Sequence, residues 1–370
     1  MLRDRLKINI MDKELIIRSS SETVDFALLK DGKLIELQRD KGNNKFSVGD
    51  VFIAKIRKVI PGLNAAFVNV GYEKDAFLHY HDLGPKLPSL LKFIKRVSTG
   101  KLKDFYLKNF PFEKDIDKHG KIASVLKSNQ SLLVQIVKEP ISTKGPRISS
   151  ELSIAGRYIV LVPFSNRVSI SQKIEDKEEK DRLKRLVKSI TPTGFGVIVR
   201  TVAQGKKVVE LDKDLQNLLS RWTAMCKKLP KAHHPSKVLG EMNKASSILR
   251  DIFNNTFTGI TVDDEELYYQ IKDYLQEIAP SKESIVKWYQ SKIPIFEKFG
   301  IERQIKTSFG KTVSMAKGAY LVIEHTEALH VIDVNSGNRS NKANSQEDTA
   351  LEVNLIAASE MARQLRLRDM

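Results

Sequence analysis

Apolar and polar residues alternate at the start of the chain, between residues 14 and 38. The turn-forming residues 30–33 divide this stretch into two arms. A period of two places the apolar side chains on one face of a strand, so the pattern predicts a β-hairpin that opens a sheet. Closely spaced short strands are predicted next, separated by glycine-containing turns, at residues 48–56, 65–71 and 75–79.

Short antiparallel strands with glycine turns and basic flanks are typical of a small barrel of the OB type. The Lys-rich stretch 83–126 interrupts the pattern, and residues 131–137 resume it. We expect the interruption to form a long loop or short helices inserted in the barrel. At 370 residues the chain has enough material for two to four domains.

A third unit is predicted from residue 147 to about residue 222. It contains strands at 158–162 and 196–201, with a charged helix at 178–188 between them. Helical spacing of leucines and Trp222 continues through residues 210–230, and segments 243–257 and 265–278 add scaffold elements. The last segment, 347–368, is predicted to be an amphipathic helix, with one face formed by Leu351, Leu355, Ala358, Ala362 and Leu365.

A second hairpin is predicted just before this helix, from strands at 319–324 and 330–335 joined by residues 325–328. Asp333 and Asn335 emerge from its second strand. A rigidly mounted carboxylate with a carboxamide offers oxygen ligands, which suit a hard cation such as Mg²⁺ or Mn²⁺. The competing interpretation is an aspartate that caps a turn at a strand end. Choosing between a metal ligand and a capping aspartate requires evidence from the rest of the sequence.

Charge and composition narrow the class of partner. The chain has 62 Lys and Arg against 45 Asp and Glu, a net charge of +17, which predicts a polyanionic partner. A generally Lys-rich surface is the alternative explanation. No apolar run approaches the length of a membrane span, and the first ten residues are too short and too charged for a signal peptide. We therefore expect a cytoplasmic protein with no membrane partner, for which Met11 is an alternative start.

The only cysteine, Cys226, excludes an internal disulfide framework and a cysteine-cluster zinc site within this chain. We expect it to be a buried thiol.

Two sets of residues are candidates for contacts with nucleic acid. In an OB barrel, Phe67 and Phe77 lie on consecutive strands and can present their rings on one face, where bases of unpaired RNA stack. The alternative places both rings in the core. Cations that would surround the rings are Lys55, Arg57, Lys58 and Lys144.

The second set follows the strand at 196–201. It delivers Arg200 and Thr201 into the loop 202–206, where we expect open backbone amides. Guanidinium, hydroxyl and amide groups together can hold a terminal phosphate. A solvated strand end without a ligand is the alternative interpretation.

Five blocks of the sequence carry a shared pattern in order: residues 61–71, 153–158, 196–201, 327–336 and 362–369. Together they resemble the ribonuclease E/G family, and in particular its ribonuclease G branch. The resemblance implies a bacterial, Mg²⁺-dependent endoribonuclease. Such an enzyme cuts single-stranded RNA internally, prefers a 5′-monophosphate end, and acts on ribosomal RNA precursors and mRNA in rRNA processing and mRNA decay.

The same resemblance implies an α+β multidomain architecture. An RNase H-like scaffold would comprise residues 11–45 and 232–305, with an OB-type RNA-binding domain, 46–146, inserted after its first part. A 5′-sensor would occupy residues 147–231. Residues 306–370 would begin a DNase I-like catalytic domain that is incomplete here.

Roles are implied for individual residues as well. Asp333 would be one of two metal-binding carboxylates, and Asn335 would orient the catalytic site. Phe67, Phe77 and Lys144 would contact RNA. The terminal phosphate would be held by Arg200 and Thr201, together with the backbone near Val160.

Two departures from the family pattern qualify this assignment. Gln172 stands where the family often carries arginine in the sensor, although Lys173 follows, and this predicts weaker selection of the 5′ end. The family's second catalytic aspartate would follow Met370. The cysteine pair for an inter-subunit Zn²⁺ and the dimerising domain of this homo-oligomeric family would lie still farther on.

The sequence therefore supports two hypotheses. The chain is part of an endoribonuclease, or it is an RNA-binding module without turnover. A translation-associated OB protein is a third class, but it leaves Asp333 without a role.

Overall fold

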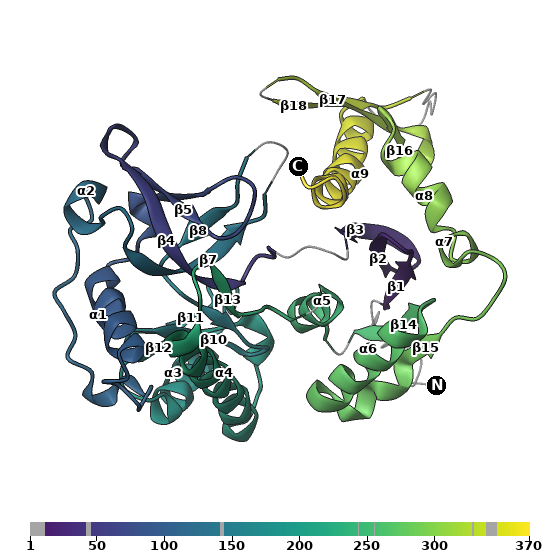
Figure 1. Ribbon diagram of the computed structural model, residues 1–370. Helices are drawn as coiled ribbons and strands as arrows, with labels where there is room; N and C mark the ends of the chain where they lie inside the picture. Colours follow the sequence, from purple (N-terminus) through teal and green to yellow (C-terminus); the bar gives the residue numbers. More distant parts are fainter. Residues whose placement is uncertain are drawn as a thin grey trace. The chain divides into compact units, whose positions relative to one another are not determined.

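The computed structural model describes most of the chain, and its elements mix helices and strands (Figure 1). The chain forms two compact units. One comprises residues 1–43, 244–248 and 252–370, and the other comprises residues 44–243 and 249–251. The alternative start Met11 lies outside the described residues. Those residues are 12–41, 46–140, 144–242, 244–254, 256–327, 329–337 and 346–370.

A five-stranded sheet organises the first unit, in the order β15-β14-β1-β2-β3. The predicted N-terminal hairpin is confirmed, because β2 and β3 pair antiparallel across the turn at residues 30–33. Strand β1 pairs antiparallel with β2 and extends the hairpin to a meander. Asp31 and Gly32 turn the chain between β2 and β3 with φ angles of 50° and 74°, the left-handed conformation that tight hairpin turns require. The strands are β1 (Lys13–Ser19), β2 (Thr23–Lys30), β3 (Lys33–Lys41), β14 (Phe257–Val262) and β15 (Val286–Trp288).

This sheet combines two distant parts of the chain. Strand β14 pairs in parallel with β1, and β15 pairs in parallel with β14. The described parts of the two segments expected to form an RNase H-like scaffold therefore contribute strands to one sheet. The RNase H-like assignment itself stays a prediction. Helices of the same unit are α6 (Glu265–Ile278), α7 (Ile295–Lys298) and α8 (Ile301–Ser308).

Asp25 is a buried charge within β2, with 4% of its surface exposed. Its carboxylate accepts hydrogen bonds from Arg18 Nη2 at 2.7 Å and from Arg39 Nε at 2.6 Å. Burial by itself would raise the pKa of Asp25, but the hydrogen bonds and charges of the two guanidinium groups hold it below its ordinary value. The carboxylate therefore stays ionised inside the sheet.

A small antiparallel sheet and a long helix complete the first unit. The sheet has the order β16-β17-β18, which confirms the predicted second hairpin. Helix α9 confirms the predicted C-terminal helix and contributes Ala357 to a core with Leu321 and Ile323. The elements are β16 (Thr312–Ser314), β17 (Tyr320–His325), β18 (His330–Asn335) and α9 (Gln346–Leu367).

The apolar face of α9 that the sequence analysis selected is not the face that packs against the rest of the unit. Leu351, Leu355 and Leu365 are 62%, 66% and 45% exposed. The buried positions are instead Val353, Ala357, Gln364 and Leu367. The helix carries two apolar stripes, and its position beside the sheets decides which of them is covered.

A closed barrel organises the second unit. Strands follow the order β4-β5-β6-β8-β7, and β7 pairs back to β4. All pairs are antiparallel except β6 with β8, and this closed five-stranded arrangement is consistent with an OB-type fold. The strands are β4 (Val51–Ile60), β5 (Ala65–Asn69), β6 (Ala76–His79), β7 (Ser131–Lys138) and β8 (Arg147–Ser149), and β13 (Ser236–Leu239) pairs with β4 outside the barrel.

The interruption between β6 and β7 contains short helices, as expected. Helix α1 (Leu87–Ser98) buries Phe93, and α2 (Ile122–Val125) buries Ile122. Phe93 meets Trp222 with ring centroids 5.4 Å apart. The inserted segment is therefore joined to the following part of the same unit by one continuous core.

A four-stranded sheet with two helices forms the rest of the second unit. The strand order is β11-β12-β10-β9, and α3 and α4 lie beside it (Figure 1). Cys226 in α4 is fully buried, and burial raises the pKa of its thiol well above the ordinary value. The expected buried thiol is thus confirmed. The elements are β9 (Ile154–Ala155), β10 (Ile159–Pro163), β11 (Val168–Ile170), α3 (Lys177–Ile190), β12 (Phe195–Val199) and α4 (Val208–Lys228).

Helix α5 (Lys244–Ile252) contributes residues to both units, and only Leu249–Asp251 belong to the second. Across the described ranges, no helix is both long enough and apolar enough to span a membrane.

Candidate functional site

Two aromatic rings lie side by side on the outer surface of the barrel. Phe67 in β5 is directly opposite Phe77 in β6, and their ring centroids are 5.9 Å apart at an interplanar angle of 66°. Both rings are half-buried, whereas their strand neighbours alternate with them and are fully buried. Alternation along each strand therefore turns the rings away from the barrel core. On the outer surface they are available to a ligand.

Cations flank this ring pair along the same row of the sheet. Lys58 is opposite Phe67, and Arg147 is opposite Phe77. Lys58 is exposed and makes no ion pair within the described parts of the chain. Arg147 is held by Asp82 through two hydrogen bonds of 3.0 Å. The row thus runs cation, ring, ring, cation, a pattern suited to bases and phosphates.

The other predicted cations differ in their exposure and in their ion pairs. Lys55 and Lys144 are exposed. Arg57 approaches the Asp75 carboxylate at 3.5 Å. Lys144 comes three residues before Arg147, on the segment that leads into β8.

Arg147 and His79 are surface groups that the sequence analysis missed. The His79 ring stacks beside the Phe77 ring, with centroids 6.4 Å apart at 28°. The period of two in β6 was a usable signal for His79, because residues two apart share a face. Arg147 gave no such signal, because its pairing with β6 joins strands that are far apart in sequence.

Arg200 and Thr201 come together at the end of β12, as the sequence predicted. The Thr201 hydroxyl lies 3.1 Å from the Ser171 hydroxyl, which follows the parallel neighbour β11. Val160 is paired with Ile198 in the adjacent strand, two residues before Arg200. Ser171 was not predicted, since only the pairing of β11 with β12 brings it to this end of the sheet.

The expectation of open amides in the following loop is wrong for most of its residues. The amides of Ala203, Gln204 and Lys206 donate to nearby carbonyls in short turns. The amide of Gly205 donates to the Glu179 carboxylate at 2.8 Å. A bound phosphate would therefore depend on side chains here more than on this loop's backbone.

Gln172 and Lys173 are both exposed, immediately after Ser171. They lie where the chain leaves β11, close in sequence to the Ser171–Thr201 hydroxyl pair. Their side chains are consequently accessible to a ligand at the sheet's end.

Asp333 and Asn335 lie on the same face of β18. Asn335 Nδ2 donates to Asp333 Oδ2 at 3.0 Å, and Asp333 is exposed. Asp333 lies within β18, opposite Val322, and Asn335 is the last residue of the strand. Ile332 and Val334 point to the other face, where they pack with α9. The carboxylate is thus mounted on a backbone whose reverse side is packed.

The donor set permits only a partial metal site. The described residues contain no cluster of three or more His, Cys, Asp or Glu side chains arranged to hold an ion. Mg²⁺ commonly keeps several waters and binds through one or two carboxylates together with substrate phosphates. Asp333 with the side-chain carbonyl oxygen of Asn335 fits such a role. This pair supplies one negative charge, and a second carboxylate would hold the ion better.

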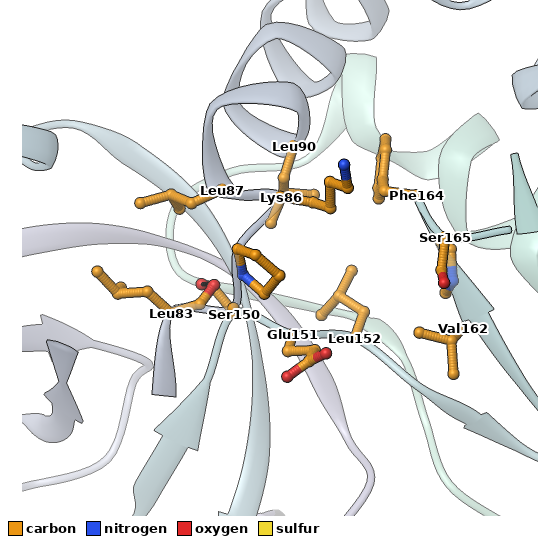
Figure 2. Close-up of a pocket in the computed structure, with 13 residues that line it drawn as sticks. Leu83, Lys86, Leu87, Leu90, Ser150, Glu151, Leu152, Val162, Phe164 and Ser165 are labelled. Atoms are coloured by element: carbon orange, nitrogen blue, oxygen red, sulfur yellow. Dashed lines mark hydrogen bonds between the residues drawn. The ribbon is translucent and has the colours of Figure 1, made fainter. Parts of the chain in front are cut away.

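A cavity in the second unit is lined by none of these candidate residues (Figure 2). Its volume is about 100 Å³, which is small beside the roughly 300–1,000 Å³ of typical ligand pockets. Leucine and Phe164 side chains dominate its walls, between α1 and β10. We interpret it as a packing gap of the inserted segment.

Comparison with known proteins assigns the chain to a family. The model of the ribonuclease E/G family matches residues 153–370, more than half of the chain. The chain belongs to the ribonuclease E/G family. That match covers the four-stranded sheet with Arg200 and Thr201 and the β17–β18 hairpin with Asp333, whereas the barrel row precedes it.

Individual relatives extend the similarity over nearly the whole chain. Ribonuclease G of Haemophilus influenzae is 30% identical over 357 residues, covering 96% of this chain and 69% of the relative. Ribonuclease G of Escherichia coli K12 is 30% identical, covering 97% and 70%. Ribonuclease E of a Nostoc species is 32% identical, covering 97% and 48%. The chain therefore spans about two thirds of the ribonuclease G relatives and half of this ribonuclease E.

Proposed function

We propose that this chain belongs to a Mg²⁺-dependent endoribonuclease that cuts single-stranded RNA and prefers a 5′-monophosphate end. Its proposed processes are rRNA processing and mRNA decay. The observation that carries the proposal is the exposed Asp333–Asn335 pair, joined at 3.0 Å, in a chain that aligns with ribonucleases along nearly its full length.

The barrel row is proposed to bind the RNA. Phe67 and Phe77 present ring surface that any base can cover, and stacking contributes about 1–3 kcal/mol per base. Lys58, Arg147 and Lys144 supply charge for the phosphates between those bases. Because rings and cations accept every base and phosphate, this surface favours unpaired RNA with little readout of sequence.

The end of the β11–β12 sheet is proposed to hold the 5′-terminal phosphate. Arg200 supplies a planar, permanently charged donor group. The hydroxyls of Thr201 and Ser171 are hydrogen-bonded to each other at 3.1 Å, so the pair supplies one further free O–H donor. The backbone near Val160, which the resemblance adds to this site, lies in the neighbouring strand with Ile198 as its register partner.

Asp333 is proposed to be the metal-binding carboxylate, with Asn335 orienting it through their hydrogen bond. A divalent cation held by Asp333 would supply a polarised water for attack on phosphorus and would shield the charge that develops there. Asp333 contributes a fixed negative charge for that cation. Asn335 contributes a carboxamide that holds the carboxylate in one rotamer.

The test is cleavage of a 5′-monophosphorylated, AU-rich oligonucleotide by the purified chain in Mg²⁺, with Asp333→Asn as the variant. We expect Mg²⁺-dependent cleavage that Asp333→Asn reduces by at least about a hundredfold, as typical for loss of a charge that acts on the reacting group. Asp348→Asn on α9 is the control, since Asp348 is an exposed acid outside the β17–β18 hairpin. Cleavage that survives Asp333→Asn undiminished contradicts the assignment.

An RNA-binding module without turnover is the second candidate. The absence of a ligand cluster of three or more groups in the described part of the chain favours it. This candidate predicts salt-sensitive binding of the same oligonucleotide with no Mg²⁺-dependent cleavage. The one assay therefore separates the two functions.

A further inference from the structure

The guanidinium group of Arg200 is fixed by two acceptors within its own unit. Nη1 donates to the Gly156 carbonyl at 2.9 Å, and Nη2 donates to Asp251 Oδ1 at 2.7 Å. The Arg200 backbone amide also donates to the Tyr158 carbonyl at 2.8 Å. Arg200 is therefore held at its backbone and at both terminal nitrogens, and its side chain remains 24% exposed.

Asp251 is itself held by a second arginine. Arg250 Nε donates to the same Oδ1 atom at 3.1 Å, and Arg250 Nη1 donates to Glu241 at 2.7 Å. Burial alone would raise the pKa of Asp251, but the hydrogen bond and charge of Arg250, with the charge of Arg200, lower it. The carboxylate is ionised and shared between two guanidinium groups, so it does not cancel the full charge of Arg200.

The second acceptor of Arg200 is also anchored. Gly156 begins a turn whose next three amides donate to the Asp214 carboxylate, at 3.1 Å from Arg157, 2.8 Å from Tyr158 and 3.1 Å from Ile159. The Gly156 carbonyl therefore has little freedom to move. Asp251 is the acceptor whose replacement changes the hold on Arg200 without disturbing this turn.

We propose that Asp251 is a positioning residue, which holds Arg200 ready for a terminal phosphate and so sets the preference for a 5′-monophosphate over a 5′-hydroxyl end. This inference rests on the proposed function. A guanidinium group has five N–H donors, and two are committed here, so three remain for phosphate oxygens. Fixing the long side chain in advance removes most of the rotamer entropy that binding would otherwise cost.

The test compares binding of two forms of one short, unstructured RNA, with a 5′-monophosphate or a 5′-hydroxyl end, by the full chain. End selection is measured by a ratio, the dissociation constant of the 5′-hydroxyl RNA divided by that of the 5′-monophosphate RNA. In Asp251→Asn we expect this ratio to fall about five- to tenfold, the scale of one typical net hydrogen bond. Affinity for the 5′-hydroxyl RNA should not change, which a general loss of structure would not allow.

Two further variants make the result decisive. Asp251→Glu keeps the charge and displaces it by one methylene, so it should also lower the ratio, and it decides the question if Asp251→Asn does not fold. Asp181→Asn, an exposed acid on α3, removes the same charge and should leave the ratio unchanged.

The outcomes distinguish this inference from the function beneath it. A wild-type ratio of one removes the proposed 5′-end selection itself, and with it the role of Asp251. A wild-type preference that Asp251→Asn leaves unchanged overturns only the positioning role. A preference that rises in Asp251→Asn also overturns it, and identifies Asp251 as a competitor of the phosphate for Arg200.

Discussion

At Asp25, one buried carboxylate meets two guanidinium groups, those of Arg18 and Arg39. The predicted hairpin did not identify this pairing, because an irregularity between Leu28 and Leu29 shifts the register of β2 and β3 and places Arg39 opposite Asp25. A buried carboxylate of this kind is stable only while its partners remain, since burial alone favours its neutral form.

This arrangement predicts how acid destabilises the first unit. The folded pKa of Asp25 is lowered from 3.8, so its stabilisation is fully present above that ordinary value and is lost as pH falls through the folded pKa. Asp25→Asn should lower the free energy of unfolding by about 1.5–3 kcal/mol at pH 7. The difference from wild type should shrink below pH 3.8, the ordinary value of the group. Urea unfolding at several pH values measures both.

Asp40→Asn is the matched control. Asp40 lies next to Arg39 in β3, is half-buried, and has no ion pair among the described residues. Its replacement should change stability by no more than about 0.5 kcal/mol. A loss in Asp25→Asn that is as large in acid as at pH 7 would contradict the electrostatic explanation.

At the scale of single elements, sequence periodicity located strands and helices well but not their buried faces. Helix α9 shows why, since its two apolar stripes satisfy the same period. Leu367 is 3% exposed and packs in a core with Ile16 and Leu34, whereas Leu355 on the other stripe is 66% exposed. Which stripe is covered depends on β1 and β3, about 330 residues earlier in the chain.

The two leucines give a matched test on one helix. Leu367→Ala should lower the free energy of unfolding by about 2–5 kcal/mol, because it leaves a cavity in a packed core. Leu355→Ala should change it by no more than about 0.5 kcal/mol, because its side chain is already in water. Equilibrium urea unfolding of the two variants provides the comparison. Equal losses would mean that Leu355 is also covered.

At the scale of the whole molecule, a net charge of +17 predicts strong dependence of RNA binding on salt. Lysine and arginine side chains that contact phosphates release counterions from RNA. For single strands, the slope of the logarithm of the binding constant against the logarithm of the salt concentration changes by about 0.7 for each phosphate contact. Lys58→Ala should therefore reduce the magnitude of that slope by about 0.7. The measurement is RNA affinity over a series of salt concentrations.

Phe77→Ala separates stacking from charge in the same experiment. It should weaken binding about 5- to 150-fold, the equivalent of roughly 1–3 kcal/mol for one stacked base, while leaving the salt slope unchanged. Tyr269→Ala is the control, since Tyr269 is an exposed aromatic residue of α6 outside the barrel. A change of slope in Phe77→Ala would show that the ring acts indirectly, by placing a cation.

The sequence by itself determined the elements and most of the candidate residues. Period-two alternation located the barrel strands with Phe67 and Phe77, and the β17–β18 hairpin with Asp333, because these patterns depend on residues only a few positions apart. Tertiary structure alone decided that Arg147 extends the ring row, that Asp251 holds Arg200, and that Leu367 rather than Leu355 is buried on α9. Each of those contacts joins segments that are distant along the chain, and local periodicity contains no information about which distant surface a residue meets.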